Sequence, residues 1–236
     1  MKKPRLCMFC GKDSSFGPMD MEHFVPKCLW AGPRPTQTRT VPSHKACNSA
    51  FSDDNEYFRD TLVFEEGAGK HPEVQKLRKG QIARKFEHRF ASIEKVLNGS
   101  RIVPIQTSSG LVVGSGPAFR LDRDRVDRVL HNVMKGIFYT VNRKPLPADW
   151  NWHVKQIEEI NVVDFEEIFA RMTPTWQSFG DDVFLCRYGF NLKNENMACL
   201  MQFYRHRIFV GWAYSDECQQ RTFEAYVNSM LLPAQE

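Results

Sequence analysis

Two pairs of metal-binding residue types, set far apart in the sequence, constrain the N-terminal part of this chain most strongly. Cys7 and Cys10 form a CxxC pair, and His44 and Cys47 form an HxxC pair after 33 intervening residues. Two ligands from each of two turns can complete a tetrahedral Cys3His site. Such zinc sites contribute on the order of 10 to 16 kcal/mol in small peptides, enough to fold a segment that has little core. The sequence therefore predicts a closed structural Zn2+ site on these residues.

The other cysteines have no such paired spacing. The total of seven is odd, and the N-terminal residues are basic and then cysteine-rich rather than an apolar signal core. No apolar run approaches the roughly 18 to 20 residues of a membrane span. We therefore expect a cytoplasmic protein without membrane association, in which the unpaired cysteines are packed thiols. These are Cys28, Cys186, Cys199 and Cys218.

An acid-histidine pair lies between the two half-sites. Glu22 and His23 precede the run Phe24-Val25-Pro26-Lys27. A neutral imidazole can take a proton from water near physiological pH, so His23 is a candidate general base. In an extended strand the Glu22 side chain would point to the opposite face. The alternative interpretation is that His23 is a satisfied core residue, or a residue that packs beside the zinc site in a finger that only binds.

Residues 31 to 42 contain three prolines and one glycine, which predicts a loop. Arg34 and Arg39 on this loop are candidate phosphate contacts. From residue 52 the sequence becomes acidic, with apolar residues near helical spacing, which predicts a helix. The expected order is strand, loop, cysteine turn and helix.

Taken in order, the CxxC pair, Glu-His-Phe-Val-Pro-Lys, the Pro-Ser-His-Lys-Ala-Cys-Asn turn and the acidic helix resemble the HNH endonucleases, also called ββα-metal or His-Me finger nucleases. The resemblance covers about residues 5 to 66. It implies hydrolysis of phosphodiester bonds in DNA, with His23 as the general base. It further implies a catalytic Mg2+ or Mn2+ ion held by Glu22 and Asn48.

The sequence departs from the family pattern in three places. His44 stands where cysteine is common, a change that zinc tolerates. The middle asparagine of the family would fall near Arg39 and Thr40, so its role is unassigned. The final histidine ligand is missing, and we expect Asp53, Ser52, Asn55 or water to replace it. Asn48 also has a structural alternative, because an asparagine after such a turn can cap the next helix.

The charge distribution is uneven along the chain. Residues 1 to 101 carry 18 Lys and Arg against 12 Asp and Glu, whereas residues 102 to 236 carry 14 against 16. Residues 67 to 101 read as a basic helical connector with nine positive and three negative side chains, interrupted at Gly80. Lys79, Arg84 and Lys85 on it are candidate nucleic-acid contacts, although such a face can also be merely solvated.

The remaining sequence predicts an α+β domain at residues 102 to 236. Short β-rich runs broken by glycine predict a hairpin over 102 to 119. Helical spacing predicts helices over 122 to 142 and 164 to 172, and strands are expected over 182 to 190, 198 to 205 and 208 to 214. The whole chain is thus expected to be α+β, with a zinc-stabilised finger at residues 1 to 66, the connector at 67 to 101 and this domain.

Two classes of function follow. The first is a metal-dependent HNH endonuclease acting on DNA, with an RNA-cleaving nuclease as a variant. The second is a non-catalytic zinc-finger protein that binds nucleic acid or acts as an adaptor. The C-terminal domain is expected to select the target, to form a homodimer or to contact a protein partner.

Overall fold

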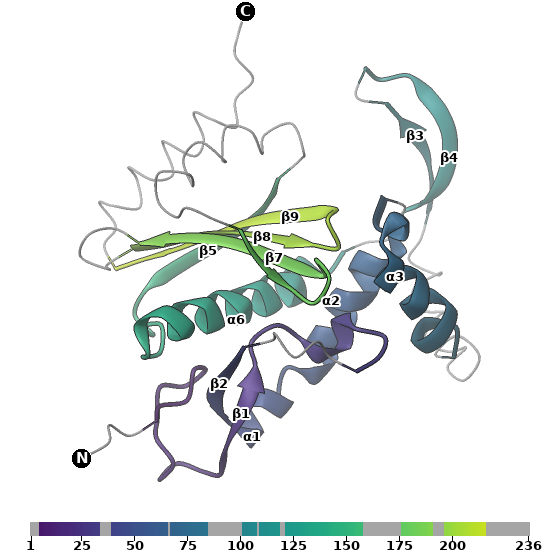
Figure 1. The fold of residues 1–236 in the computed structure, drawn as a ribbon. Coiled ribbons are helices and arrows are strands. Elements are labelled where there is room, and N and C mark those ends of the chain that lie inside the picture. Colours follow the sequence, from purple (N-terminus) through teal and green to yellow (C-terminus); the bar gives the residue numbers. More distant parts are fainter. Residues whose placement is uncertain are drawn as a thin grey trace, which may run out of the picture.

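The computed structural model describes residues 5–33, 39–65, 67–84, 101–107, 109–118, 121–157, 176–190 and 196–215. Its elements form an α+β fold with antiparallel sheets, as predicted (Figure 1). In chain order they are β1 (Met19–His23), η1 (Lys27–Leu29), β2 (Thr40–His44), α1 (Lys45–Ser49), α2 (Ser52–Phe64), η2 (Gly67–Lys70), α3 (Pro72–Leu77), η3 (Arg78–Ile82), β3 (Arg101–Gln106), β4 (Val112–Ala118), α6 (Arg123–Asn142), β5 (Asn151–Ile157), β6 (Gln177–Phe179), β7 (Phe184–Phe190), β8 (Asn196–Phe203) and β9 (Arg207–Tyr214).

The N-terminal part is a β-hairpin followed by two helices. Strands β1 and β2 pair antiparallel, with Glu22 opposite Val41 and His23 opposite Thr40. Because proline cannot donate a ladder hydrogen bond, Pro26 fits beyond the end of β1, where the chain turns into η1. Helix α1 begins directly after β2, and α2 follows it. The helix predicted from residue 52 is present as α2. The loop predicted over residues 31 to 42 is wrong at its end, because Thr40 already begins β2, and its residues 34 to 38 lie outside the described residues.

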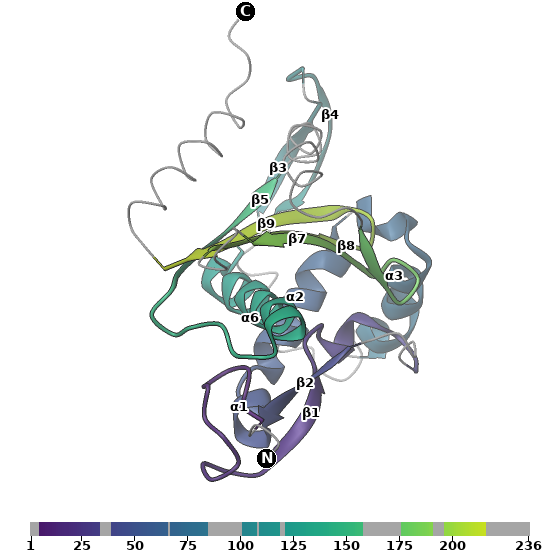
Figure 2. The same cartoon turned by 60° about the vertical axis from the view of Figure 1, so that its left-hand side comes forward.

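Helices α2 and α6 pack against one face of the five-stranded sheet, whose strand order is β5-β9-β8-β7-β6 (Figures 1 and 2). Phe58 of α2 lies with its ring 5.0 Å from that of Phe203 and 6.1 Å from that of Phe209. Phe138 of α6 packs in the same way against Phe190, at 5.8 Å. These aromatic contacts bury large apolar areas and fix both helices on the sheet.

The segment after β1 joins the same core. The ring of Phe24 lies 5.8 Å from Phe179 and 6.4 Å from Phe184, and the hydroxyl of Tyr204 donates to the carbonyl of Leu29 at 2.8 Å. A single cluster of buried apolar residues runs from Met8 to Ala213. The division at residues 66 and 101 remains a prediction, but the buried core of the described residues is continuous across it.

The basic connector is helical in its described part. After α3, the chain makes a π-helical turn, η3, which contains Gly80, the residue at which the sequence pattern breaks. Arg78 donates to the carbonyls of Val63 and Glu65 at 2.8 and 2.7 Å. This cation therefore has a structural role, because it binds the C-terminal end of α2. Lys79 and Arg84 are exposed.

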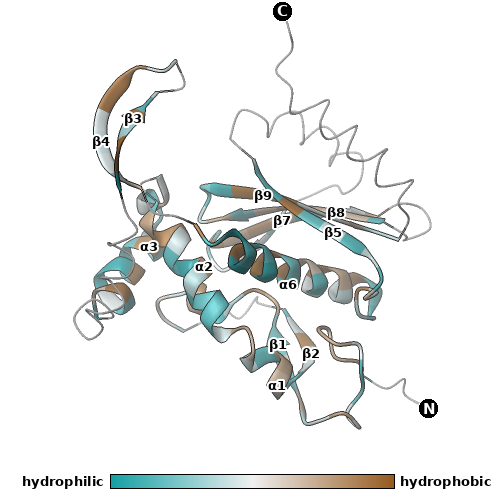
Figure 3. Ribbon diagram, turned by 180° about the vertical axis from the view of Figure 1, so that it is seen from behind, coloured by the Kyte–Doolittle hydropathy of each residue, from teal (hydrophilic) through white to brown (hydrophobic). Residues whose placement is uncertain are grey.

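The predicted hairpin of residues 102 to 119 is present as β3 and β4, which pair antiparallel. It projects from the body of the molecule and carries apolar residues on its surface (Figure 3). The most exposed of these are Ile102 at 70%, Leu111 at 65% and Val113 at 62%.

Elsewhere the strands deviate from the predicted bounds. Strand β5 was not predicted, although Trp152 and Val154 alternate with polar residues in it, because the alternation covers only a few residues. β6 is three residues long and also escaped prediction. Strand β8 covers Asn196–Phe203 rather than the predicted 198 to 205, and Tyr204 and Arg205 in the turn that follows it adopt left-handed backbone angles. The helix predicted over residues 164 to 172 lies outside the described residues.

The cysteines outside the two pairs were expected to be packed thiols, and those in the described residues are consistent with this. Cys186 and Cys199 are buried, and the Cys28 thiol donates to the carbonyl of Asn55 at 3.2 Å. Cys218 lies outside the described residues. Within the described ranges, no helix is both long and apolar enough to cross a bilayer.

Gly136 allows α6 to approach the segment after β1. A Cβ atom at this position would lie 1.9 Å from Cβ of Phe24, near the root of that side chain, so the backbone would have to move. We expect Gly136→Ala to destabilise the fold by about 1 to 3 kcal/mol in urea unfolding, although alanine is otherwise favoured in helices. Gly80→Ala, where a Cβ meets open space, is the matched control. Equal stability of the two variants would contradict this packing.

Candidate functional site

Cys7, Cys10, His44 and Cys47 come together as predicted. Their ligand atoms all lie within 4.8 Å of one another, so the group could hold a metal ion. His44 Nδ1 lies 3.3 Å from Cys10 Sγ and 3.9 Å from Cys47 Sγ. Bond lengths of about 2.0 to 2.3 Å around a tetrahedral zinc ion place ligand atoms roughly 3.5 to 3.8 Å apart. The observed spacing is close to that of a tetrahedral site.

Local hydrogen bonds shape the first half-site. The amide of Gly11 donates to the carbonyl of Cys7 at 2.9 Å, and the amide of Cys7 donates to the carbonyl of Lys12 at 2.8 Å. Gly11 has φ of +73°, a left-handed angle that glycine adopts without steric cost. The amide of Met8 donates to the carbonyl of Pro42, so this turn is bonded to β2.

The ring of His44 is oriented by its second nitrogen. Nε2 lies 2.8 Å from the carbonyl oxygen of Asp13, to which it can donate only as N–H. This contact leaves the Nδ1 lone pair directed at the cysteine sulfurs. A metal-binding histidine is commonly held by a carbonyl in this way. His44 is buried, which excludes water from that side of the cluster.

Cys7 and Cys47 differ in their tendency to ionise. Burial opposes ionisation of Cys7, but backbone N–H groups of Cys10, His44 and Phe9 outweigh it and lower its pKa to about 7. Burial, followed by the charges of the neighbouring cysteines, raises the pKa of Cys47 to about 12. Because like charges repel at these distances, a bound cation is what would hold all three sulfurs as thiolates.

Lys135 of α6 lies near enough to the cluster for the charges of the three cysteines to affect its pKa. Burial lowers the pKa of Lys135, while the charges of Cys7, Cys10 and Cys47 act in the opposite direction. Three thiolates, one neutral histidine and a divalent cation carry a net charge of −1, which a nearby ammonium group offsets. This interaction could not be predicted from the local pattern, because Lys135 lies far along the chain in a helix of ordinary amphipathic pattern.

Glu22 and His23 are the last two residues of β1, and both are half-buried. A carboxylate oxygen of Glu22 lies 3.2 Å from Nζ of Lys27, whose side chain is 50% exposed. Because successive side chains alternate in a strand, both can serve one reaction centre only if the chain bends at its end. β1 does end at His23.

The other predicted ligands of the catalytic cation come from the two helices. Asn48 lies in α1, one residue after Cys47, and is half-buried. Asp53 lies in the first turn of α2 with an exposed side chain. Among the described residues, Glu22, His23 and Asp53 do not form a group spaced for a metal ion; the one group of that kind is the Cys3His cluster.

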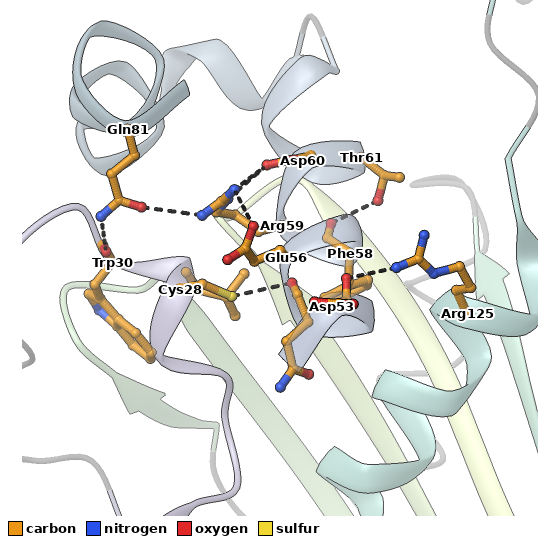
Figure 4. A network of polar contacts seen from close by, with 12 residues as sticks. Cys28, Trp30, Asp53, Glu56, Phe58, Arg59, Asp60, Thr61, Gln81 and Arg125 are labelled. Atoms are coloured by element: carbon orange, nitrogen blue, oxygen red, sulfur yellow. Dashed lines mark hydrogen bonds and ion pairs between the residues drawn. The ribbon is translucent and has the colours of Figure 1, made fainter. Parts of the chain in front are cut away.

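A polar network ties α2 to the segment after β1 (Figure 4). Buried Arg59 donates to the Asp60 carboxylate at 2.6 and 2.8 Å, and to Gln81 at 3.2 Å. Gln81 in turn donates to the carbonyl of Ala31 at 3.3 Å. At the start of α2, Arg125 of α6 donates to the carbonyl of Asp53 at 2.8 Å. The network fixes α2 against the segment that leaves β1.

The predicted phosphate contacts lie in different places. Arg39 is exposed immediately before β2, and Lys79 and Arg84 are exposed on the connector. Arg34 and Lys85 lie outside the described residues.

Comparisons of the chain with known protein families, with curated proteins and with solved structures return no match. The candidate site therefore stands on its own residues: a Cys3His cluster able to hold a metal ion, and a β-hairpin carrying an acid-histidine pair.

Proposed function

We propose that this chain is a metal-dependent endonuclease of the HNH type, which hydrolyses phosphodiester bonds in DNA. One observation supports the proposal most strongly. The Cys3His cluster clamps a β-hairpin whose first strand ends in Glu22 and His23, and the helix behind it presents Asn48 directly after a cluster ligand. This arrangement has the strand-loop-strand-helix order that a ββα-metal finger requires.

The metal of the cluster is proposed to be zinc. Cys3His sets with near-tetrahedral spacing select Zn2+ as a structural ion, and four protein ligands leave no open position for a reaction. The cluster would thus shape the finger, whereas the chemistry would occur at the end of β1.

Glu22 and Asn48 would hold the catalytic cation. A carboxylate and an amide oxygen are the ligand types that Mg2+ and Mn2+ prefer. When bound, the cation neutralises charge on the scissile phosphate and the leaving oxygen. Lys27, now paired with Glu22 at 3.2 Å, has a half-exposed side chain, and the four-carbon stem of a lysine is flexible. It can leave the carboxylate and move toward the incoming phosphate.

His23 would act as the general base. As a neutral imidazole it accepts a proton from the attacking water, and its half-buried position at the strand end limits its motion. Deprotonation of the water and its alignment with the phosphorus are the two contributions required of this residue.

The Glu22–Lys27 ion pair favours a second candidate, a zinc finger that binds nucleic acid without cleaving it. A carboxylate already satisfied by lysine needs no metal ion. On this alternative the same hairpin would serve as a binding or adaptor surface. A protein partner or homodimer contact through residues 102 to 236 remains a prediction on either account.

The direct test is cleavage by the purified, zinc-loaded chain. Supercoiled plasmid and single-stranded RNA are each incubated at low salt with Mg2+, with Mn2+ or with neither. We expect nicking of the plasmid that requires an added divalent ion. Binding without cleavage under all conditions would favour the adaptor, and cleavage confined to RNA would assign the other substrate.

A further inference from the structure

The Cys3His cluster lies at one end of the hairpin formed by β1 and β2, and the proposed general base lies at the other. His44 of the cluster pairs with Met19 at the start of β1, whereas His23 pairs with Thr40 at the end of β1. At about 3.3 Å per residue, this separation along the strand is roughly 13 Å. The cluster therefore fixes the far end of the strand, and the position of His23 depends on other contacts.

The residue that follows His23 is buried among three elements of the C-terminal half. The ring of Phe24 packs edge to face against Phe179 of β6 at 5.8 Å and against Phe184 of β7 at 6.4 Å. Helix α6 approaches the same side chain at Gly136, where an added Cβ would lie 1.9 Å from Cβ of Phe24. Phe24 is only 4% exposed. Its ring thus has little room to move.

The chain that leaves β1 is also held at its far end. The hydroxyl of Tyr204, in the turn between β8 and β9, donates to the carbonyl of Leu29 at 2.8 Å. The amide of Ala31 donates to the carboxylate of Glu73 in α3 at 2.6 Å. Both Tyr204 and Leu29 are buried. Because close-packed interiors resist displacement, the end of β1 can shift only if the core around this segment also shifts.

A general base requires such restraint. His23 is the last residue of β1, so the ladder with β2 supports it from one side only. Proton transfer needs the imidazole in line with the attacking water, and a displacement of about 1 Å can lower a rate by roughly 100-fold. The contacts of Phe24 supply the support that the ladder lacks beyond His23.

We infer that Phe24 is a positioning residue for His23, and that the C-terminal half of the chain is the support that fixes the proposed general base. The inference rests on the proposed nuclease function and goes beyond it, because it gives β6, β7 and α6 a part in the reaction. Phe24 is buried and does not meet the substrate. It acts through the backbone that joins it to His23.

Single-turnover cleavage of plasmid by an excess of zinc-loaded protein tests this role. Phe24→Leu keeps an apolar side chain but loses both edge-to-face contacts, and Gly136→Ala disturbs the same packing from α6. Each substitution should lower the maximal rate by about 10- to 100-fold, with the half-saturating protein concentration within about twofold of the wild type. Zinc content should be unchanged. All rates are measured well below the unfolding midpoint of each variant.

Phe138→Leu is the matched control for a weakened core. Phe138 is as buried as Phe24, but its ring packs against Trp150 and Phe190. This variant should lose stability to a similar extent and keep a maximal rate within about twofold of the wild type. Equal rate losses in Phe24→Leu and Phe138→Leu, or full activity of Phe24→Leu, would overturn the inference while the nuclease function stands.

The NMR signal of the His23 imidazole separates the inference from the proposed function, because it requires no cleavage. The signal is assigned by its absence from His23→Ala. In Phe24→Leu we expect it to broaden or split as the ring samples several positions, and in Phe138→Leu we expect it to match the wild type. A wild type that cleaves no nucleic acid would defeat the nuclease proposal alone. An unchanged signal in Phe24→Leu would show that Phe24 does not hold His23.

Discussion

Replacing His23 with alanine should lower the rate of metal-dependent plasmid nicking by roughly 10²- to 10⁴-fold, the usual contribution of a general base. His23 is half-buried at the end of β1, so the substitution removes the imidazole without opening the core. The measurement is the initial rate of conversion of supercoiled to nicked plasmid at saturating Mg2+. Zinc content and thermal unfolding should stay as in the wild type.

His206→Ala provides the matched histidine control. His206 lies in the turn between β8 and β9, next to Glu65, and has no place in the proposed reaction. Its rate should equal that of the wild type. Equal nicking by His23→Ala and the wild type would mean that another residue, or another protein in the sample, performs the cleavage.

Replacing Cys7 with serine should release the structural metal and unfold the N-terminal segment. Zinc sites of this type contribute on the order of 10 to 16 kcal/mol in peptides, which is as large as the whole stability of a typical domain. Cys7 is buried, and its sulfur also accepts from the amide of His44 at 3.3 Å. We expect zinc to fall from about one per chain to none, with loss of hydrogen-exchange protection in β1 and β2.

Cys28→Ser is the control that distinguishes the loss of a cluster residue from the loss of a cysteine elsewhere in the fold. The Cys28 thiol donates to a carbonyl, a contact that a serine hydroxyl can replace, and it lies outside the cluster. This variant should keep its zinc and its protection. Retention of zinc and of full protection by Cys7→Ser would show that the four residues do not form the predicted site.

The Cys3His cluster, which could hold a metal ion, could be predicted from the sequence because its residues occur as two local pairs. CxxC and HxxC spacings each place two side chains on one turn, so only the meeting of the two turns is non-local. Helix α6 could be predicted for a similar reason, since its apolar residues repeat at helical spacing and Asp122 caps it by accepting from Arg125 at 3.3 Å. Both patterns are contained within a short stretch of chain.

The joining of the hairpin to the C-terminal half could not be predicted in this way. Phe24 packs against Phe179 and Phe184, more than a hundred residues later, and Gly136 leaves the space for it. The local sequence around each of these residues does not indicate which distant residue it contacts.

The surroundings of the proposed catalytic residues could not be predicted from the sequence either. The pairing of Glu22 with Lys27 depends on the path of the chain after Pro26. Asp53 remains a predicted ligand at the position of the missing histidine. In the structure it is exposed in the first turn of α2, and it does not group with Glu22 and His23.

The central claim is that one hairpin carries two metal sites, a structural zinc cluster and a separate catalytic cation next to His23. Anomalous X-ray diffraction from crystals grown with Mn2+, recorded at the zinc and manganese absorption edges, tests it most directly. We expect a zinc peak among Cys7, Cys10, His44 and Cys47, and a manganese peak at the Glu22 carboxylate and Asn48 amide. A zinc peak at the cluster with no manganese at Glu22 would contradict the nuclease account and leave a metal-stabilised binding finger.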